Sequence, residues 1–285
     1  MRFAFIRRHT VEFPVDVMCA VLEVSTSGYY AWLHRPESLR SRDDRRLLLE
    51  IRAIHRQSRR RYGSPRLHRE LRHRGYACCR HRVARLMRQD GLEGTYRRKF
   101  RVTTDSKHRW PVAENRLARQ FEVSRPNTVW AADITYIRTR EGWLYLAVLL
   151  DLCSRRVVGW AISSRLNRRL PQAALEMAIG RRRPRSPILH HSDRGSQYAS
   201  HDYRQALSDA GFVVSMSRRG DCYDNAPVES FFATLKKELV AGEVFYCRSH
   251  AYSEIVDYIE GFYNSWRRHS ALGYISPTAF EEKVA

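Results

Sequence analysis

The spacing of apolar residues divides the chain near residue 100. Before that point, apolar residues recur at intervals of three, four and seven, which is typical of amphipathic helices. After Asn127 the pattern changes to short runs rich in Val, Ile, Leu and aromatic residues, which is typical of strands. The sequence therefore predicts an all-helical first half and a second half that contains a sheet. The helical spacing is clearest at Leu47, Leu48, Ile51, Ile54, Leu67, Leu71, Val83, Leu86 and Met87.

Two segments of the first half resemble helix-turn-helix units. In the first, a short apolar helix ends at Leu22, a turn follows over residues 23–25, and a second helix starts with polar residues. In the second, Ser64 is expected to cap a helix that has Pro65 at its first position, and Gly75 is expected to end it. Such hairpins place Arg and Ser against the DNA major groove, although the same pattern also occurs in hairpins that only pack on proteins.

The second half begins with three consecutive β-rich runs, NTVWAADITYIRT, WLYLAVLLDLC and RRVVGWAIS, which predict an antiparallel meander. Helices and strands then alternate. We expect a helix over 170–179, a strand at PILHHSD, a helix near 203–210, a strand at FVVSMS and a long helix over about 226–239. This order predicts an α/β fold with a mixed sheet and helices on its faces. The polar residues 101–125, which include Pro111, are interpreted as a linker.

The charge of the chain identifies a class of partner. Lys and Arg number 51 against 30 Asp and Glu among 285 residues, a net charge of +21. Residues 1–126 hold 30 of the basic and only 13 of the acidic residues, and only five of the 51 basic residues are Lys. This excess of arginine favours nucleic acid as the partner of the first half, because Arg matches phosphate oxygens and guanine edges.

Membrane insertion and secretion are not expected. The longest apolar stretch is interrupted by Asp151 and is too short to span a bilayer, and the first residues lack the pattern of a signal peptide. Six scattered cysteines without a CxxC pair are interpreted as reduced cytosolic thiols. A zinc site at His68, His73, Cys78 and Cys79 is disfavoured, because adjacent cysteines cannot clasp a metal as a CxxC pair does.

Three carboxylates are candidates for chemistry. Asp133 lies in the middle of the first strand, Asp193 ends the short strand ILHHSD, and Glu229 lies near the start of the last core helix, after the expected caps Asp224 and Asn225. Singly, each has an ordinary alternative. Asp133 could pair with an arginine, Asp193 could cap the turn before Gly195, and Glu229 could be a common first-turn glutamate.

Together the three carboxylates fit a site for hard cations. Two aspartates and a glutamate can hold two Mg²⁺ ions about 4 Å apart, the arrangement that serves in-line attack on a phosphodiester. Asp151 also ends an apolar strand, but DLCSRR has the composition of a hairpin connection. We therefore expect Asp151 and Ser154 to bond turn amides and leave Asp151 out of the metal site.

The motifs around these carboxylates resemble a known family. Asp193 and Glu229 are separated by 35 residues, the D-35-E spacing of retroviral-type integrases and many bacterial transposases. WAADITYI, LLDLCSRRVVGW, HHSDRGSQYAS, GDCYDNAPVESFFATLKKEL and YNSWRRHSALGYISPTAFE closely resemble the second-frame product (OrfB) of insertion-sequence transposases of the IS-three family. CAVLEVSTSGYYAW and YGSPRLHRELRHRG resemble that family's DNA-binding region, so the likeness covers nearly the whole chain.

The resemblance implies a ribonuclease-H-like catalytic core of the DDE type, preceded by helical DNA-binding segments. The family's metal-binding and catalytic triad falls on Asp133, Asp193 and Glu229, with two Mg²⁺ ions for which Mn²⁺ can substitute. It implies metal-dependent strand cleavage and strand transfer at the ends of an insertion sequence, in which water or a 3′-hydroxyl attacks a phosphodiester. Residues expected to contact DNA are Lys236, Arg66, Arg80, Arg82, Arg85 and Arg194.

The resemblance also implies partners and a domain order. The partners are the terminal inverted repeats, target DNA, further copies of the chain on DNA, and the upstream-frame (OrfA) product, as a fusion or a separate partner. Its helix-turn-helix and leucine zipper are not expected in this chain. The expected location is the bacterial cytoplasm, at the nucleoid. The expected segments are a helix-turn-helix (1–45), a second helical DNA-binding segment (46–100), a linker (101–125), an integrase-like core (126–240) and a C-terminal helix and tail (241–285).

Two other functions compete with this one. Tyr263, Arg267 and His269 suggest a tyrosine recombinase, although YNSWRRHSALGYISPTAF also fits a closing helix whose aromatic residues pack on the core. A DNA-binding regulator without enzymatic activity would use only the first half of the chain. That alternative leaves the three carboxylates unexplained.

Overall fold

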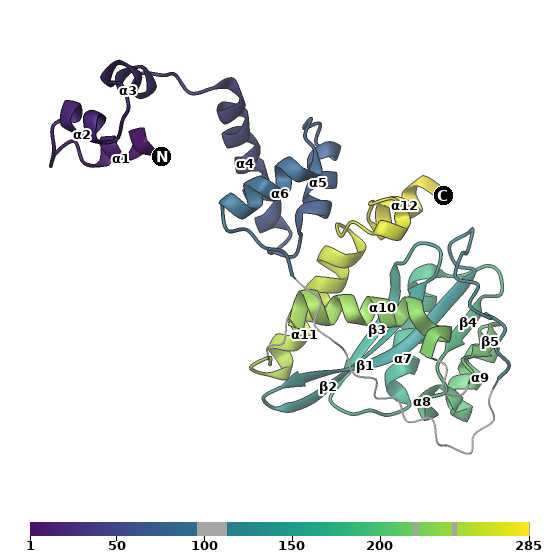
Figure 1. Cartoon of the computed structure of the whole chain (residues 1–285). Coiled ribbons are helices and arrows are strands. Elements are labelled where there is room, and N and C mark those ends of the chain that lie inside the picture. The colour runs from purple at the N-terminus through teal and green to yellow at the C-terminus, as the bar shows by residue number, and fades with distance from the viewer. Residues whose placement is uncertain (96–112, 219–221, 241–243, 285) are drawn as a thin grey trace. The chain divides into compact units, whose positions relative to one another are not determined.

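The computed structural model describes residues 1–95, 113–218, 222–240 and 244–284 (Figure 1). The chain forms two compact units, Met1–Ala53 and Ile54–Ala285. Within the described ranges, no helix combines the length and the apolar character that crossing a bilayer requires.

The first unit contains helices α1 (Arg2–Arg8), α2 (Val15–Val21) and α3 (Thr26–Leu33). The side chain of Ser25 accepts a hydrogen bond from the Gly28 amide at 3.0 Å and so caps α3, which confirms the predicted turn between two helices. The small core of this unit consists of Ile6, Met18, Cys19 and Tyr29. Helix α4 (Leu39–Gln57) follows and continues into the second unit.

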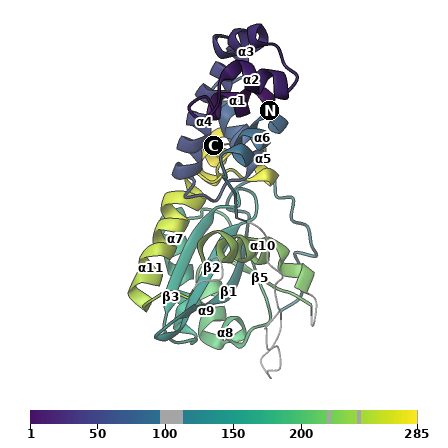
Figure 2. The ribbon, with the colours of Figure 1, turned by 60° about the vertical axis from the view of Figure 1, so that its left-hand side comes forward.

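Helices α5 (Ser64–His73) and α6 (Arg80–Gln89) open the second unit (Figure 2). Both are amphipathic, as predicted, and bury residues spaced by three and four, among them Leu67 and Leu71 on α5. The predicted cap is wrong. Gly63, with extended backbone, takes the N-cap position without a side-chain bond, and Ser64 is already helical. Pro65 lies in the first turn as predicted, where its missing N–H costs nothing.

The second unit is built on one five-stranded mixed sheet with the order β3-β2-β1-β4-β5. Neighbouring strands are antiparallel in the pairs β1–β2 and β2–β3 and parallel in the pairs β1–β4 and β4–β5. The predicted meander and the ribonuclease-H-like mixed sheet are therefore confirmed. The strands are β1 (Val129–Thr139), β2 (Gly142–Asp151), β3 (Val157–Ser163), β4 (Leu189–Ser192) and β5 (Val213–Met216).

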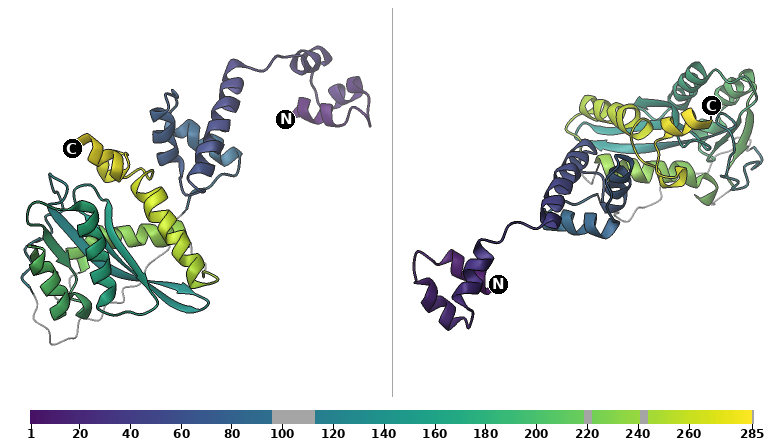
Figure 3. Two further views of the ribbon diagram at one scale, coloured as in Figure 1. Left: turned by 180° about the vertical axis from the view of Figure 1, so that it is seen from behind. Right: turned by 90° about the horizontal axis from the view of Figure 1, so that it is seen from above.

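Helices cover both faces of the sheet. Helix α7 (Arg169–Arg182) packs on β2 and β3, and α10 (Ala226–Leu235) packs on β1 and β2 from the other side, as the front and back views show (Figures 1 and 3). Helix α7 approaches β3 so closely that a Cβ on Gly159 would lie 2.2 Å from the Ala174 carbonyl oxygen, so only glycine fits there. Two short helices, α8 (Ser196–Ala199) and α9 (His201–Asp209), follow β4.

The C-terminal part is helical but not regular. A 3₁₀ turn (Cys222–Asn225) precedes α10, and the predicted helix to residue 239 is α-helical only to Leu235, beyond which Lys236–Val240 form a π-helical turn. Such turns have no clear sequence signal, and they are frequent at functional sites. The remaining elements are α11 (Arg248–Val256), a π-helical segment (Asp257–Asn264), a 3₁₀ turn (Ser270–Leu272) and α12 (Pro277–Val284).

The segment expected to be a linker is partly attached to the sheet. Residues 101–112 lie outside the described residues, but residues 114–117 bond to β5, where the Met216 amide donates to the Glu114 carbonyl at 3.4 Å. Leu117 is buried, and its amide donates to the Ser215 hydroxyl at 3.2 Å. The Asn115 amide donates to the Asp224 carboxylate at 2.8 Å. This part of the segment therefore belongs to the packed second unit.

Candidate active site

The strand register brings two of the predicted carboxylates to the same edge of the sheet. Strands β1 and β4 run parallel, and the last paired residues are Ala132 and Ser192. The next residue on each strand is Asp133 or Asp193. Because parallel neighbours lie about 4.8 Å apart, the two aspartates lie next to each other at the point where β4 ends.

The third carboxylate is brought to this edge by a buried amide. The Asn225 side chain is 4% exposed, and its Nδ2 donates to the carbonyl oxygen of Ala132 at 3.0 Å. This bond fixes the start of α10 against β1, one residue before Asp133. Glu229 lies in the first turn of α10. Three segments that are distant in the sequence therefore converge at one place.

The expected capping of α10 is wrong. Neither Asp224 nor Asn225 caps the helix with its side chain. Asp224 is fully buried and accepts hydrogen bonds from Arg218, Arg119 and Asn115, and the bonds from Arg218 and then Arg119 lower the pKa of its carboxyl below its usual range. The two residues instead bind the loop before α10 to the strands, which was not visible in the local sequence.

The three carboxylates interact electrostatically. Burial and then the charge of Asp193 raise the pKa of Asp133 well above its usual value; Glu229 adds to the rise, and Lys236 opposes it. The carboxyl of Glu229 keeps much of its surface exposed, yet burial and Asp193 raise its pKa as well. Like charges gathered in this way repel one another, and a bound cation would relieve the repulsion.

Of the ordinary structural roles considered for the three carboxylates, the one for Asp193 is observed. The Asp193 carboxylate accepts the Gly195 amide at 2.8 Å and so does cap the turn before that glycine. The Asp133 carboxylate accepts the Ile134 amide at 2.7 Å, but among the described residues no arginine pairs with it. A backbone amide thus holds one oxygen of Asp133 and one oxygen of Asp193, which orients each side chain.

Asp151 has the structural role predicted for it. One oxygen accepts the amides of Cys153 and Ser154 at 2.9 and 3.0 Å, and the other accepts the Asn127 amide at 2.6 Å. The Ser154 hydroxyl in turn accepts the Arg156 amide at 3.3 Å. Asp151 is fully buried in this turn, and both of its oxygens are occupied.

Two histidines that the sequence analysis did not single out hold β4 in place. His190 and Tyr203 bond through Nε2 and the hydroxyl at 2.9 Å, and burial lowers the pKa of His190 to about 3. His191 bonds the hydroxyls of Ser215 and Ser217 at 2.9 and 3.2 Å, and burial lowers its pKa to about 4. Both imidazoles are therefore neutral at physiological pH and anchor the strand that ends at Asp193.

Two buried polar atoms near the carboxylates have no hydrogen-bond partner among the described residues. They are the Tyr198 hydroxyl, which feels the charges of Asp133 and Asp193, and Oδ1 of Asn225. Buried polar groups of this kind usually bond to water or an ion. In the described part of the chain no three His, Cys, Asp or Glu side chains are close enough together to hold a metal by themselves.

The shifted pKa values make a prediction for the metal-free protein. A carboxyl whose pKa is raised by folding destabilises the fold once it is ionised, because the unfolded chain releases the proton more easily. We expect Asp133→Asn to melt at a higher temperature than the wild type at pH 7 in EDTA. The difference should vanish as the pH falls below the unfolded pKa of about 4, where both side chains are neutral. Melting curves across this pH range check it, and equal stability at pH 7 would contradict the repulsion.

The residues of the tyrosine-recombinase alternative do not form a site. Tyr263 is 1% exposed and packs edge-on against Phe231 with ring centroids 4.7 Å apart. Arg267 is buried and donates to both oxygens of Glu238. His269 has a pKa lowered to about 3, mainly by burial. These side chains pack in the core, as the alternative interpretation of this segment predicted.

The residues expected to contact DNA differ in their surroundings. Arg66 is partly buried: it donates to the Arg268 carbonyl at 3.1 Å and lies 3.5 Å from the buried Glu238 carboxylate, and its contact with DNA stays a prediction. Arg194 is half-buried and donates to the Ser217 carbonyl at 2.6 Å. Burial lowers the pKa of Lys236, and the negative charge of Asp133 opposes this shift. The three arginines of α6 are Arg80, which is exposed, Arg82, which is partly buried, and Arg85, which donates to Gln89 at 3.0 Å.

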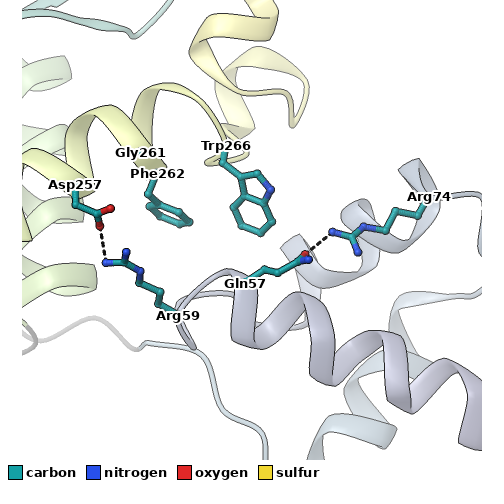
Figure 4. A pocket seen from close by; sticks show the side chains of 7 residues that line it. All are labelled: Gln57, Arg59, Arg74, Asp257, Gly261, Phe262 and Trp266. Carbon is teal, nitrogen blue, oxygen red and sulfur yellow. Dashed lines mark hydrogen bonds and ion pairs between the residues drawn. The ribbon is translucent and has the colours of Figure 1, made fainter.

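The zinc alternative finds no support in the described residues. His68 bonds the Cys78 carbonyl oxygen at 3.1 Å, and Cys79 is exposed. The five described cysteines are all free, in agreement with reduced thiols. A pocket of about 410 Å³ lies elsewhere, between the end of α4 and the C-terminal π-helical segment, where Phe262 and Trp266 face Gln57 (Figure 4). It is not lined by the three carboxylates.

Comparison with known proteins gives matches along most of the chain. Residues 41–100 match an HTH-like domain family, and residues 123–222 and 210–277 match two integrase core domain families. The chain is 48% identical to the insertion element IS600 uncharacterized 31 kDa protein of Shigella sonnei, over 93% of this chain and 98% of that one. It is 46% identical to transposase InsF for insertion sequence IS3A of Escherichia coli K12, over 99% of both chains.

Among solved structures, the chain is similar to the simian T-cell lymphotropic virus intasome, with 14% identity over 81% of this chain and 74% of that one and a TM-score of 0.47. It is also similar to the HTLV-2 integrase catalytic core domain in complex with magnesium, with 16% identity over 55% of this chain and 97% of that one and a TM-score of 0.43. The extent and identity of the sequence matches decide the assignment: the chain belongs to the IS3 (IS-three) family of insertion-sequence transposases.

Proposed function

We propose that this chain cleaves and joins DNA strands at the ends of an insertion sequence, with Asp133, Asp193 and Glu229 as the catalytic carboxylates. The observation that carries the proposal is their convergence from β1, β4 and α10, together with the raised pKa of Asp133 and of Glu229, to which burial and then Asp193 contribute. The reaction is an in-line displacement. The oxygen of water or of a 3′-hydroxyl bonds to phosphorus as the bond to the leaving strand oxygen breaks.

The carboxylate site fits Mg²⁺. Carboxylate oxygens are the ligands that Mg²⁺ prefers, and the unpartnered oxygen of Asn225 and hydroxyl of Tyr198 fit the water shell that this ion keeps. Without a cation the carboxylates repel one another, so the exposed Glu229 side chain is expected to turn inward only when the charge is neutralised. Two Mg²⁺ ions, or Mn²⁺ in their place, would activate the attacking oxygen and stabilise the leaving oxygen.

The chain's own residues contribute orientation and charge. Backbone amides donate to one oxygen each of Asp133 and Asp193, which fixes the orientation of both carboxylates. We assign Lys236 and Arg194 to the DNA phosphates near this site, because both are cations within or beside it. Arg80, Arg82 and Arg85 on α6 are assigned to the DNA bound by the helical segments, through phosphate contacts that weaken as salt rises.

The partners follow from the reaction. Joining two element ends requires both ends in one complex, so we propose a homo-oligomer on DNA that holds the terminal inverted repeats and then the target DNA. We also propose that the upstream-frame (OrfA) product acts with this chain, as a fusion or as a separate partner, and that the complex works at the nucleoid. We also propose that the chain is organised in the segments 1–45, 46–100, 101–125, 126–240 and 241–285. The described residues of 101–125 pack with the core.

The test is incubation of the full chain with DNA carrying the element ends, followed by mapping of strand breaks. We expect breaks at the element boundary with Mg²⁺. Ca²⁺ should permit binding but not cleavage, because its larger and looser coordination shell does not impose octahedral geometry. Breaks that do not depend on a divalent cation, or DNA left covalently attached to the protein on a denaturing gel, would contradict the proposal. If the chain is inactive alone, the upstream-frame product is added.

A further inference from the structure

The strands β1 and β2 extend past their neighbours as a two-stranded ribbon. Strand β4 pairs with β1 only over residues 129–132, and β3 pairs with β2 only from Tyr145 onward. Residues 136–145, which we call the ribbon, therefore project beyond the rest of the sheet (Figure 1). The ribbon leaves the sheet directly after Asp133, on the strand that carries this carboxylate.

The two faces of the ribbon differ. Ile137 and Leu144 are paired in the register and are 2% and 4% exposed, so they form the buried face. The pairs Tyr136–Tyr145 and Arg138–Trp143 lie on the other face. Trp143 is 49% exposed, and the Arg138 guanidinium lies over its ring at 5.9 Å from the centroid. The outer face thus carries aromatic rings and an arginine.

A second arginine–ring pair lies at the tip of the ribbon. Tyr246 is 70% exposed, and the Arg140 guanidinium lies 5.3 Å from its ring centroid. The tip is fixed, because the Arg140 amide donates to the Phe245 carbonyl at 2.9 Å and the Glu141 carboxylate accepts the Arg248 amide at 2.8 Å. The rings are therefore presented on a rigid support, and the acidic residue at the tip is already bonded.

We infer that this surface binds unpaired nucleotides of the DNA substrate, on the other face of β1 from Asp133, an inference that rests on the proposed function. Exposed rings interleaved with arginines are what single strands require, because bases stack on the rings and phosphates meet the guanidinium groups. Bases in a duplex cannot use such rings, since neighbouring base pairs cover their faces. Cross-strand ring contacts alone would explain Tyr136 and Tyr145, but not the exposure of Trp143 and Tyr246.

The position of the ribbon sets where the unpaired bases lie. Arg138 is five residues along β1 from Asp133, which at about 3.3 Å per residue is about 17 Å, and Trp143 lies opposite it on β2. The odd spacing puts the Arg138 side chain on the other face of β1 from the Asp133 carboxylate, so an unpaired strand on the rings passes the edge of the ribbon to reach the phosphodiester at Asp133. The surface therefore holds one strand separated close to the point of cleavage.

The test compares two DNAs in binding assays with the full chain in EDTA: a perfectly paired duplex, and one of the same length with an unpaired thymidine tract of about ten nucleotides. Trp143→Ala should weaken binding to the unpaired tract about tenfold and change duplex binding less than about twofold. Trp143→Phe, which keeps a ring, should retain most of the affinity. Tyr246→Ala should act like Trp143→Ala.

The matched control is Tyr252→Ala. Tyr252 is a similarly exposed ring on α11, at 48%, that packs edge-on against Trp160 and is not covered by an arginine in the described structure. It should leave both affinities unchanged. Equal losses on both DNAs, a loss on the duplex alone, or no loss would overturn the inference. Selective binding of the tract without Mg²⁺-dependent cleavage would instead contradict the proposed function and leave this inference standing.

Discussion

Glu229→Gln is expected to slow strand cleavage by several orders of magnitude while the protein stays folded. The substitution keeps the size and shape of the side chain, and Glu229 is exposed at the start of α10, so the free energy of unfolding should change by no more than about 1 kcal/mol. The substitution removes a negatively charged oxygen ligand, so a metal ion in the carboxylate site is bound poorly. The transition state of the in-line attack then loses the stabilisation that the metal provides.

The measurement is Mg²⁺-dependent nicking of DNA that carries the element ends, with a melting curve and a DNA-binding assay on the same preparation. Asp133→Asn and Asp193→Asn should behave alike, and none of the three should weaken DNA binding, because each removes a charge that repels phosphate. Glu176→Gln is a control that changes the same chemical group at an exposed position of α7, the helix on the other face of the sheet from α10. Normal cleavage by folded Glu229→Gln would remove Glu229 from the site.

Glu238→Ala is expected to give the largest loss of stability, about 3–5 kcal/mol. The Glu238 carboxylate is 2% exposed in its side chain and accepts bonds from both Nε and Nη2 of Arg267 at 2.9 Å and from the Tyr258 hydroxyl at 2.9 Å. Burial raises the pKa of Glu238, but Arg267 outweighs this, so the pKa lies below its usual value. Removal of the carboxylate leaves the Arg267 charge buried without its partner.

Urea unfolding measures this loss. Glu254→Ala is the matched control, because Glu254 is 38% exposed and lies 3.8 Å from Arg59, a surface pair worth at most about 1 kcal/mol. A double variant, Glu238→Gln with Arg267→Met, should recover part of the stability, since it removes the buried Arg267 charge together with its partner. A loss below 1 kcal/mol in Glu238→Ala would show that the pair contributes no more than the surface one.

The local pattern of the sequence is sufficient to predict much of the fold. The meander was predicted because each strand is a continuous apolar run and each connection is short. The role of Asp151 was predicted because DLCSRR has the composition of a turn, and its carboxylate does accept the turn amides. The paired helices of the first unit were predicted from a short apolar helix that ends at Leu22 and the turn over residues 23–25, and in the structure Ser25 caps the second helix. All of these depend on residues close together in the chain.

Two contacts were not visible in the local sequence because the partner is far away in the chain. Arg66 was expected to contact DNA, and the structure also gives it a partner within the chain, the Arg268 carbonyl, 202 residues away. Asp224 and Asn225 were expected to cap α10, but the Asn225 amide reaches Ala132, 93 residues away. Charge and local composition cannot distinguish an arginine on DNA from one in a buried network. The three carboxylates could be predicted to form one site because the resemblance to the family implies which distant residues lie together.

The most direct test of the account is a change of metal preference at Asp193. Asp193→Cys replaces a hard oxygen ligand by a sulfur that Mg²⁺ accepts poorly and softer divalent ions such as Zn²⁺ accept well. Cleavage of DNA with the element ends is measured for this variant and for the wild type, with Mg²⁺ alone and with added Mn²⁺ or Zn²⁺. The account predicts that Asp193→Cys is inactive with Mg²⁺ and recovers part of its cleavage with the softer ion, at the same phosphodiester as the wild type. Cleavage by Asp193→Cys at the wild-type rate with Mg²⁺ would contradict metal binding by Asp193.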